Sequence, residues 1–277
     1  MTERPQPLQR RRAGVLLHPT SLPGAGEHGD LGPEAWRFVD FLADAGFSVW
    51  QTLPLGPTHE DRSPYQCLSA HAGNPALIAA EPLVEAGWLD GSRIAGASRR
   101  DWLAAAHRGF DERADAKARA AYASFCDKHA HWLQDFTLFM VLRGHHRDAP
   151  WWEWPEALRD RDAQALSRAR RGLAGELEQR RFEQFLFFSQ WARLKDHAER
   201  NGVVLFGDLP IFVAYDSAEV WAQREYFAVD AHGRAEVVAG VPPDYFSETG
   251  QRWGNPHYRW SRMAEDDYRW WVERMHT

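Results

Sequence analysis

Residues 14–53 read GVLLHPTSLPGAGEHGDLGPEAWRFVDFLADAGFSVWQTL, and this stretch decides the fold. Its first four residues form a short apolar run, which is typical of a parallel strand buried on both faces. Pro33 then opens a helix at its first turn, and Gly46 ends it. A second apolar run follows at residues 47–53. A strand, a helix and a strand in this order predict a βαβ unit, and therefore a parallel sheet with a right-handed crossover.

A third apolar run, from Val203 to Pro210, follows a helix that the apolar spacing predicts over residues 182–198. Asp208 stands where this strand ends. In a barrel of parallel strands the active site lies at the carboxyl ends of the strands, so Asp208 is a candidate site residue. The alternative is that Asp208 caps a helix or forms a turn, as a lone aspartate often does.

The stretch 240–260 reads GVPPDYFSETGQRWGNPHYRW and differs in character from the rest. Two consecutive prolines cannot continue a helix or enter a central strand, so they predict a stiff extended loop. The loop combines flat aromatic faces with short polar groups, which suit a ligand that is apolar on its ring faces and hydroxylated at its edge, such as a sugar. These side chains are Asp244, Tyr245, Phe246, Ser247, Thr249, Gln251, Trp253 and Asn255. The alternative is a surface loop that its aromatic residues merely pin in place.

Tyr245 and Phe246 are adjacent in this loop. Neighbouring side chains on an extended backbone point to opposite sides. We therefore expect one of the two rings to face the sugar and the other to anchor the loop.

The composition is that of a soluble globular protein, because 44% of the residues are hydrophobic, 26% are charged, and no apolar run is long enough to cross a bilayer. The net charge of −6 argues against a nucleic-acid partner, which would require a basic face. Cys67 and Cys126 are predicted to be thiols, as in a reducing compartment. Residues 1–12 are expected to form a disordered tail. The apolar run after them is too short for the core of a signal peptide, which favours a cytoplasmic location.

Four histidines lie in two close pairs, His129 with His131 and His145 with His146. Neither pair has an HExxH-like spacing, and neither is matched by a pair of cysteine partners. The sequence therefore predicts no metal, and it implies no cofactor.

Several motifs resemble those of amylomaltases, the 4-α-glucanotransferases of glycoside hydrolase family 77. They are GVPPDYFSETGQRWGNP at 240–256, SPYQ and SAHAGNP within 63–75, and GDLPIFVAYDSAEVW at 207–221. The resemblance extends over nearly the whole chain from Gly14 onward, with one departure at His71, where the family carries an aromatic residue. It implies that Tyr65 contacts bound glucan and that Asp208 holds the sugar beside the scissile bond. The substrate-binding residues that it implies are Ser63, Tyr65, Gln66, Asp208, Tyr245, Phe246, Ser247, Gln251, Trp253 and Asn255.

The same resemblance implies an α/β fold in which residues 13–277 are the N-terminal part of a (β/α)8 TIM barrel, interrupted by a mainly helical insertion at about 76–179. The insertion contains the segment WWEWP at 151–155, whose tryptophans we expect to pack in the core. The barrel is incomplete in this chain, because the third strand ends near residue 210 and the remaining residues are too few for the other βα units. We therefore expect the sequence to be the N-terminal portion of a longer enzyme.

Retaining enzymes of this kind place two carboxylates about 5–5.5 Å apart, one as nucleophile and one as acid and base. The family motifs that carry them, of the kinds RIDHFRG, AEDLG and THD, do not occur in the sequence. The catalytic pair is therefore expected beyond Thr277, and the chain alone is expected to be inactive. The partners implied are α-1,4-glucans and maltooligosaccharides, while the oligomeric state is not indicated. Two alternatives remain, a non-catalytic glucan-binding fragment and a hydrolase of the α-amylase kind.

Overall fold

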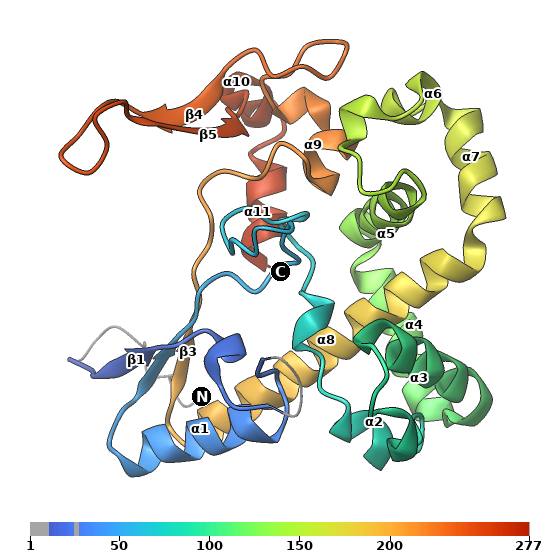
Figure 1. Ribbon diagram of the computed structural model, residues 1–277, viewed down its shortest axis with the longest axis vertical. Coiled ribbons are helices and arrows are strands. Elements are labelled where there is room, and N and C mark those ends of the chain that lie inside the picture. Colours follow the sequence, from blue (N-terminus) through green and yellow to red (C-terminus); the bar gives the residue numbers. More distant parts are fainter. Residues whose placement is uncertain (1–10, 25–27, 277) are drawn as a thin grey trace. The chain divides into compact units, whose positions relative to one another are not determined.

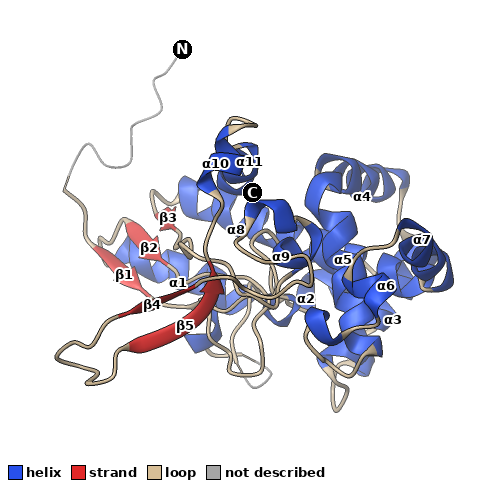
Figure 2. Ribbon diagram, turned by 90° about the horizontal axis from the view of Figure 1, so that it is seen from above, coloured by secondary structure: helices blue, strands red, loops and turns tan. Residues whose placement is uncertain are grey.

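Three short parallel strands form the sheet of the first of two compact units into which the chain divides (Figures 1 and 2). The computed structural model describes residues 11–24 and 28–276. The first unit comprises residues 1–55, 73–122 and 182–209, and the second comprises residues 56–72, 123–181 and 210–277. Residues 1–10 of the expected disordered tail lie outside the described residues.

The predicted βαβ unit is confirmed by the pairing of the strands. Strands β1 (Gly14–Leu16), β2 (Val49–Gln51) and β3 (Val204–Phe206) lie in the order β1-β2-β3, and both pairs are parallel. Gly14 faces Val49 so closely that a Cβ at this position would lie 2.6 Å from the Val49 carbonyl oxygen. The start of β1 therefore requires glycine.

The strands are less buried than the sequence predicts. Trp50 on the central strand is fully buried, and its indole donates to the Leu17 carbonyl at 2.8 Å. Leu16 on β1 is 55% exposed, however, and Phe206 on β3 is 47% exposed. Both of these strands are edges of the three-stranded sheet, so their side chains lack the neighbour on one side that covers the central strand.

Helix α1 (Pro33–Asp44) and, from Phe182 onward, helix α8 (Ala174–Arg200) belong to the same unit as the sheet. Helix α1 starts at the predicted proline, and it packs on β2 through the Phe38 and Trp50 rings, whose centroids are 5.0 Å apart. The His197 Nε2 atom lies 2.7 Å from a carboxylate oxygen of Asp40, which joins the end of α8 to α1. Gly202, with a φ of +73°, follows α8 in the left-handed conformation that commonly ends a helix.

Two buried glutamines of α8 hold the segment that follows residue 72. The Gln184 amide exchanges two hydrogen bonds with the backbone of Gly73, both 2.9 Å long. Gln190 makes the same pair of bonds with Ala79, at 2.8 and 2.9 Å. A Cβ on Gly73 would lie 1.9 Å from the Phe187 ring, so this close approach requires glycine. These bonds satisfy polar groups that would be costly to bury unpaired.

The described residues from 76 to 179 form helices and turns and contain no strand. The helices are α2 (Glu81–Glu85), α3 (Arg99–Arg113), α4 (Ala116–Lys128), α5 (Ala130–His145), α6 (Glu156–Arg159) and α7 (Ala163–Gly172). Trp151 and Trp154 are almost completely buried, which confirms that these two pack in the core, while Trp152 is half-buried and stacks on the Tyr215 ring. The Trp151 indole donates to the Tyr215 carbonyl at 2.9 Å.

The second unit also contains α9 (Ala218–Ala222), β4 (Val238–Val241), β5 (Gln251–Pro256), α10 (Trp260–Ala264) and α11 (Arg269–His276). The Ser217 hydroxyl caps α9 by accepting from the Val220 amide at 3.4 Å. Asp216 does not share this role, because its carboxylate pairs with Arg143 and accepts from the Trp151 amide.

Candidate functional site

The predicted sugar-binding loop is in fact a β-hairpin. Strands β4 and β5 pair antiparallel, with Val241 opposite Gln251, so that residues 242–250 form the hairpin tip (Figure 1). Trp253 and Asn255 therefore lie on a strand, which corrects the expectation of a loop throughout. The two prolines begin the tip, because neither could donate a hydrogen bond to the ladder.

Local hydrogen bonds shape the hairpin tip. One carboxylate oxygen of Asp244 accepts from the Phe246 and Ser247 amides, both at 2.9 Å. The Ser247 hydroxyl donates to the Gly250 carbonyl at 2.8 Å. Gly250 has a φ of +73°, and a Cβ there would lie 2.5 Å from the Val241 carbonyl oxygen, so the turn back into β5 requires glycine.

The tip presents two aromatic rings to the solvent. Tyr245 is 96% exposed and Phe246 is 90% exposed. Their ring centroids are 5.5 Å apart and the rings are almost perpendicular, at 87°. Within this chain neither ring anchors the tip, because the turn chemistry of Asp244 fixes it and leaves both rings uncovered. Two large apolar rings exposed side by side indicate a surface that is used for binding.

Trp253 on β5 is half exposed, and its indole donates to the Gln251 side chain at 3.1 Å. Residues two apart lie on the same face of a strand, which brings these side chains together. On this face of β5 the indole ring of Trp253 and the side-chain amide of Gln251 lie together, next to the hairpin tip. Such a combination can stack on a sugar ring and bond to its hydroxyl groups.

The segment 63–66 reaches the hairpin through one long-range hydrogen bond. The side-chain amide of Gln66 donates to the side-chain oxygen of Asn255 at 3.2 Å. The side-chain amide of Asn255 in turn donates to the Val213 carbonyl at 2.8 Å. A turn holds the segment, because the backbone N–H of Gln66 donates to the Ser63 carbonyl at 3.1 Å. Tyr65 in this turn is 46% exposed. We refer to Gln66, Val213 and Asn255, with the aromatic cluster described next, as the hairpin base.

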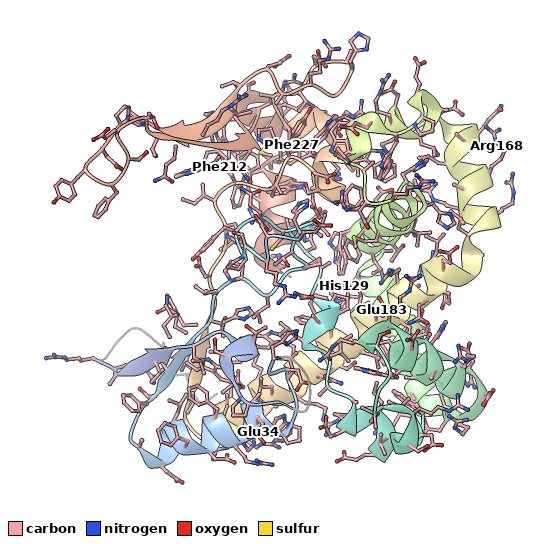
Figure 3. The ribbon with its side chains drawn as sticks, in the orientation of Figure 1. Glu34, His129, Arg168, Glu183, Phe212 and Phe227 are labelled. Carbon is pink, nitrogen blue, oxygen red and sulfur yellow. The ribbon has the colours of Figure 1, made fainter. Side chains whose placement is uncertain are left out.

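An aromatic cluster continues the hairpin base below Asn255. Tyr258 packs between Phe212 and Phe227, both labelled in Figure 3, at ring-centroid distances of 6.1 and 5.5 Å. Trp270 of α11 lies 5.5 Å from the same ring. The Arg274 guanidinium is buried beside Trp270 and donates to the Pro210 carbonyl at 2.7 Å. Burial raises the pKa of Tyr258 to about 12, so its hydroxyl stays protonated and donates to the Ile211 carbonyl.

A buried polar group also follows the segment 63–66. The Ser69 hydroxyl donates to the Glu219 carboxylate at 2.6 Å and accepts from the backbone amides of His71 and Ala72. Burial raises the pKa of the Glu219 carboxyl, and it raises the pKa of the Cys67 thiol to about 12. Burial, together with the nearby His131, lowers the pKa of His71 to about 3. These groups are fixed parts of the interior, and an unreactive protonated thiol at Cys67 suits that place.

Sequence reasoning missed this interior group. Ser69 and Glu219 are 150 positions apart, so no local pattern connects them. The only available signal was the departure at His71, which lies against Trp132 and Trp270.

The predicted site residues do not all come together. Nine of them lie in the second unit, and the Gln66 to Asn255 bond joins their two segments: Ser63, Tyr65, Gln66, Tyr245, Phe246, Ser247, Gln251, Trp253 and Asn255. Asp208 belongs to the first unit, where it follows β3 and is half-buried.

Across the described residues no cluster of three or more histidine, cysteine or acidic side chains could hold a metal ion. In the same part of the chain, no helix is both long enough and apolar enough to cross a membrane.

Comparison with known proteins gives a consistent match. Residues 17–277 match the family model of 4-alpha-glucanotransferases, glycoside hydrolase family 77. A 4-alpha-glucanotransferase of Thermus thermophilus is 50% identical over 96% of this chain and 55% of its own length. The Arabidopsis thaliana 4-alpha-glucanotransferase DPE1, chloroplastic/amyloplastic, is 40% identical over 98% of this chain and 50% of its own length. The solved amylomaltase of Streptococcus agalactiae, in complex with acarbose, superposes with a TM-score of 0.91 at 36% identity, over 96% of this chain and 57% of that one. The chain thus spans about half the length of these relatives.

Proposed function

This chain belongs to glycoside hydrolase family 77, the 4-alpha-glucanotransferases, and we propose that it forms the glucan-binding part of such an enzyme. The whole enzyme moves an α-1,4-glucan segment to glucose or to a maltooligosaccharide by a retaining double displacement. The observation that carries this proposal is the hairpin, whose exposed Tyr245 and Phe246 stand on a base joined to the segment 63–66.

The chemistry of the hairpin supports a glucan as the ligand. A sugar ring has apolar faces that can cover the rings of Tyr245 and Trp253, and its hydroxyl groups can bond to polar side chains such as Gln251. The solved amylomaltase of Streptococcus agalactiae contains acarbose, a glucan analogue, which supports the same class of ligand.

The fold proposed for the whole enzyme is a (β/α)8 barrel. Strands β1, β2 and β3 are three of its strands, residues 13–277 belong to the barrel, and residues 76–179 are its helical insertion. The half-exposed Leu16 and Phe206 on the edge strands support this proposal, because further strands on either side would cover them. The structural match to a solved amylomaltase, with a TM-score of 0.91 over about half of that protein, supports the same fold.

In the proposed mechanism Asp208 holds the sugar beside the bond that breaks, as expected for a carboxylate at the end of a barrel strand. The nucleophile and the acid/base lie beyond Thr277. Transfer exceeds hydrolysis when sugar rings occupy the acceptor side and keep water out, and the hairpin supplies rings suited to that role. The cytoplasmic location predicted from the sequence is retained as part of the proposal.

Product analysis with maltotriose tests the proposal. A protein that contains both this chain and the catalytic carboxylates is expected to give a ladder of longer maltooligosaccharides. If it gave only shorter sugars, it would be a hydrolase of the α-amylase kind. The purified chain of residues 1–277 is expected to leave maltotriose unchanged, and any disproportionation by it would refute the placement of the catalytic pair.

A further inference from the structure

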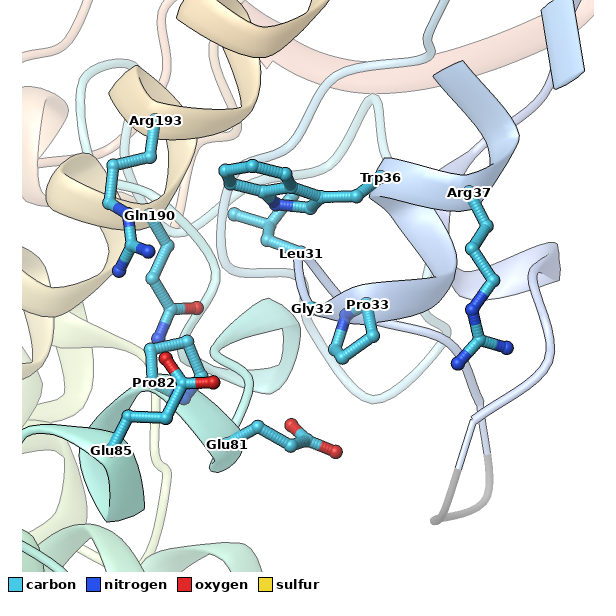
Figure 4. A pocket seen from close by; sticks show the side chains of 10 residues that line it. All are labelled: Leu31, Gly32, Pro33, Trp36, Arg37, Glu81, Pro82, Glu85, Gln190 and Arg193. Atoms are coloured by element: carbon cyan, nitrogen blue, oxygen red, sulfur yellow. The ribbon is translucent and has the colours of Figure 1, made fainter. Parts of the chain in front are cut away.

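A pocket lies in the first unit. Its volume is about 340 Å³, and it opens between the start of α1, the short helix α2 and the middle of α8 (Figure 4). Pockets that hold small ligands range over roughly 300–1,000 Å³, so this one suits a ligand of one or two rings. The residues that line it are Leu31, Gly32, Pro33, Trp36, Arg37, Glu81, Pro82, Glu85, Gln190 and Arg193.

One wall of the pocket is aromatic and well supported. The Trp36 indole stacks on the His197 imidazole, with ring centroids 4.6 Å apart and planes 26° apart. The Arg193 guanidinium lies 5.7 Å from the centre of the indole ring. Leu31 and Pro33 extend this wall (Figure 4). Because His197 is itself held by its bond to Asp40, the indole rests on a fixed neighbour.

The opposite side of the pocket is polar. Figure 4 shows Glu81 and Glu85 of α2 across the cavity from the indole. Both of these side chains are exposed, so their carboxylates are hydrated and can accept bonds from a ligand. The side-chain amide of Gln190 is already used, because its oxygen accepts from the Ala79 backbone N–H and its nitrogen donates to the Ala79 carbonyl. Gln190 therefore stiffens the wall of the pocket.

The lining carries charges of both signs. It includes two guanidinium groups, those of Arg37 and Arg193, and two carboxylates, those of Glu81 and Glu85. Arg37 is also paired with Glu34 at 2.5 Å, so part of its charge is neutralised outside the lining. A phosphate or carboxylate ligand would be repelled by the two glutamates, and a cation would meet the two arginines. The lining therefore favours a neutral ligand that has one apolar face and several hydroxyl groups.

We propose that this pocket binds one or two rings of a neutral sugar, with a ring face on Trp36 and hydroxyl groups bonded to Glu81, Glu85 and Arg193. Ring stacking supplies the apolar contact, and mixed donors and acceptors around the edge match hydroxyl groups, which both donate and accept. The binding of a sugar ring follows from the pocket alone. The choice of an α-1,4-linked glucose unit as that sugar rests on the proposed function.

Calorimetric titration of the 277-residue chain with maltose tests this site. The starting protein carries Tyr245→Ala and Trp253→Ala, so that the hairpin contributes little to binding. In this background we expect saturable binding, and we expect Trp36→Ala to weaken it roughly tenfold, on the scale of one lost stacking contact. Glu85→Ala, at an exposed position that cannot disturb the core, is expected to weaken binding roughly threefold, on the scale of one hydrogen bond. Phe41→Ala is the matched control, because Phe41 is an exposed ring on the same helix that does not line the pocket.

A further titration compares D-glucose with its 6-phosphate, which carries the same ring and an added negative charge. Weaker binding of the phosphate supports a pocket for neutral ligands, and tighter binding refutes it. Absence of saturable binding in the hairpin variant, or equal affinities with and without Trp36, would also overturn the proposed site. A hairpin variant that binds maltose as tightly as the unchanged chain would count against glucan binding by the hairpin and would leave the pocket proposal intact, so the two proposals fail separately.

Discussion

The tip and the base of the hairpin are held by different kinds of interaction. At the tip, Asp244 and Ser247 bond to backbone groups no more than three residues away, and the two rings between them are uncovered. At the base, Asn255 is buried and its side chain bonds to Gln66, a residue 189 positions away. The tip therefore depends on local turn chemistry and the base on the packing of the whole unit. This difference separates side chains that can change without unfolding the protein from those that cannot.

The largest effect is expected for Trp270→Ala in the hairpin base. Trp270 is 1% exposed and packs on Tyr258, so its removal leaves a cavity that should cost about 3–5 kcal/mol of the free energy of unfolding. Urea unfolding measures this loss. Trp253→Ala is the matched control near the tip, because Trp253 is 47% exposed and should cost less than about 1 kcal/mol. Similar losses for the two variants would remove the distinction between base and tip.

The second effect concerns pH and His71, which lies against Trp270. Burial lowers the pKa of His71 to about 3 in the folded protein, while the unfolded chain titrates near the ordinary 6.5. The stability contributed by this group is therefore complete above pH 6.5 and is lost as the pH falls from there toward 3. His71→Phe keeps an aromatic ring but cannot take up a proton. Between pH 7 and pH 4 the free energy of unfolding of this variant should therefore fall less than that of the unchanged chain, by an amount on the order of a few kcal/mol.

Urea unfolding at several pH values between 7 and 4 measures this dependence. Tyr245→Ala at the tip is the control, and it should retain the full pH dependence of the unchanged chain. Parallel pH profiles for the unchanged chain and His71→Phe would show that His71 does not carry the effect.

How much of the structure could be predicted from the sequence differs between the tip and the base of the hairpin. The βαβ unit was predictable, because short apolar runs around a helix opened by Pro33 leave few other arrangements. The aromatic character of the tip was also predictable from Tyr245 and Phe246. Strand β5 was missed, since Gly254 inside it and Pro256 at its end obscure its alternation, and the preceding prolines pointed to a loop.

The base could not be predicted by the same reasoning. The bond between Gln66 and Asn255 depends on where the chain brings two distant segments, which neither segment encodes locally. The burial of Glu219 is set in the same way by Ser69 and its neighbours. Edge strands β1 and β3 were predicted to be buried because their residues are apolar, but apolar composition does not specify whether a neighbouring strand is present.

A smaller effect is expected for Asn255→Ala. It removes a buried amide that bonds to Val213 and Gln66, and it leaves the Val213 carbonyl without this donor, at a cost of about 1–3 kcal/mol. Gln251→Ala at the exposed end of the same strand is the matched control and should cost less than about 0.5 kcal/mol. Thermal unfolding of both variants measures the difference, and equal melting temperatures would contradict the role of Asn255 in the base.

The smallest effect on stability, and the most direct test of the tip as a glucan-binding surface, comes from the double variant Tyr245→Ala and Phe246→Ala. Its affinity for maltoheptaose and its unfolding in urea are measured together with those of Phe41→Ala, an exposed ring elsewhere. We expect the tip variant to bind roughly tenfold more weakly, as befits lost ring stacking, and to keep its stability within about 0.5 kcal/mol. Unchanged affinity in the tip variant, or a loss of affinity that Phe41→Ala reproduces, would contradict glucan binding by the hairpin.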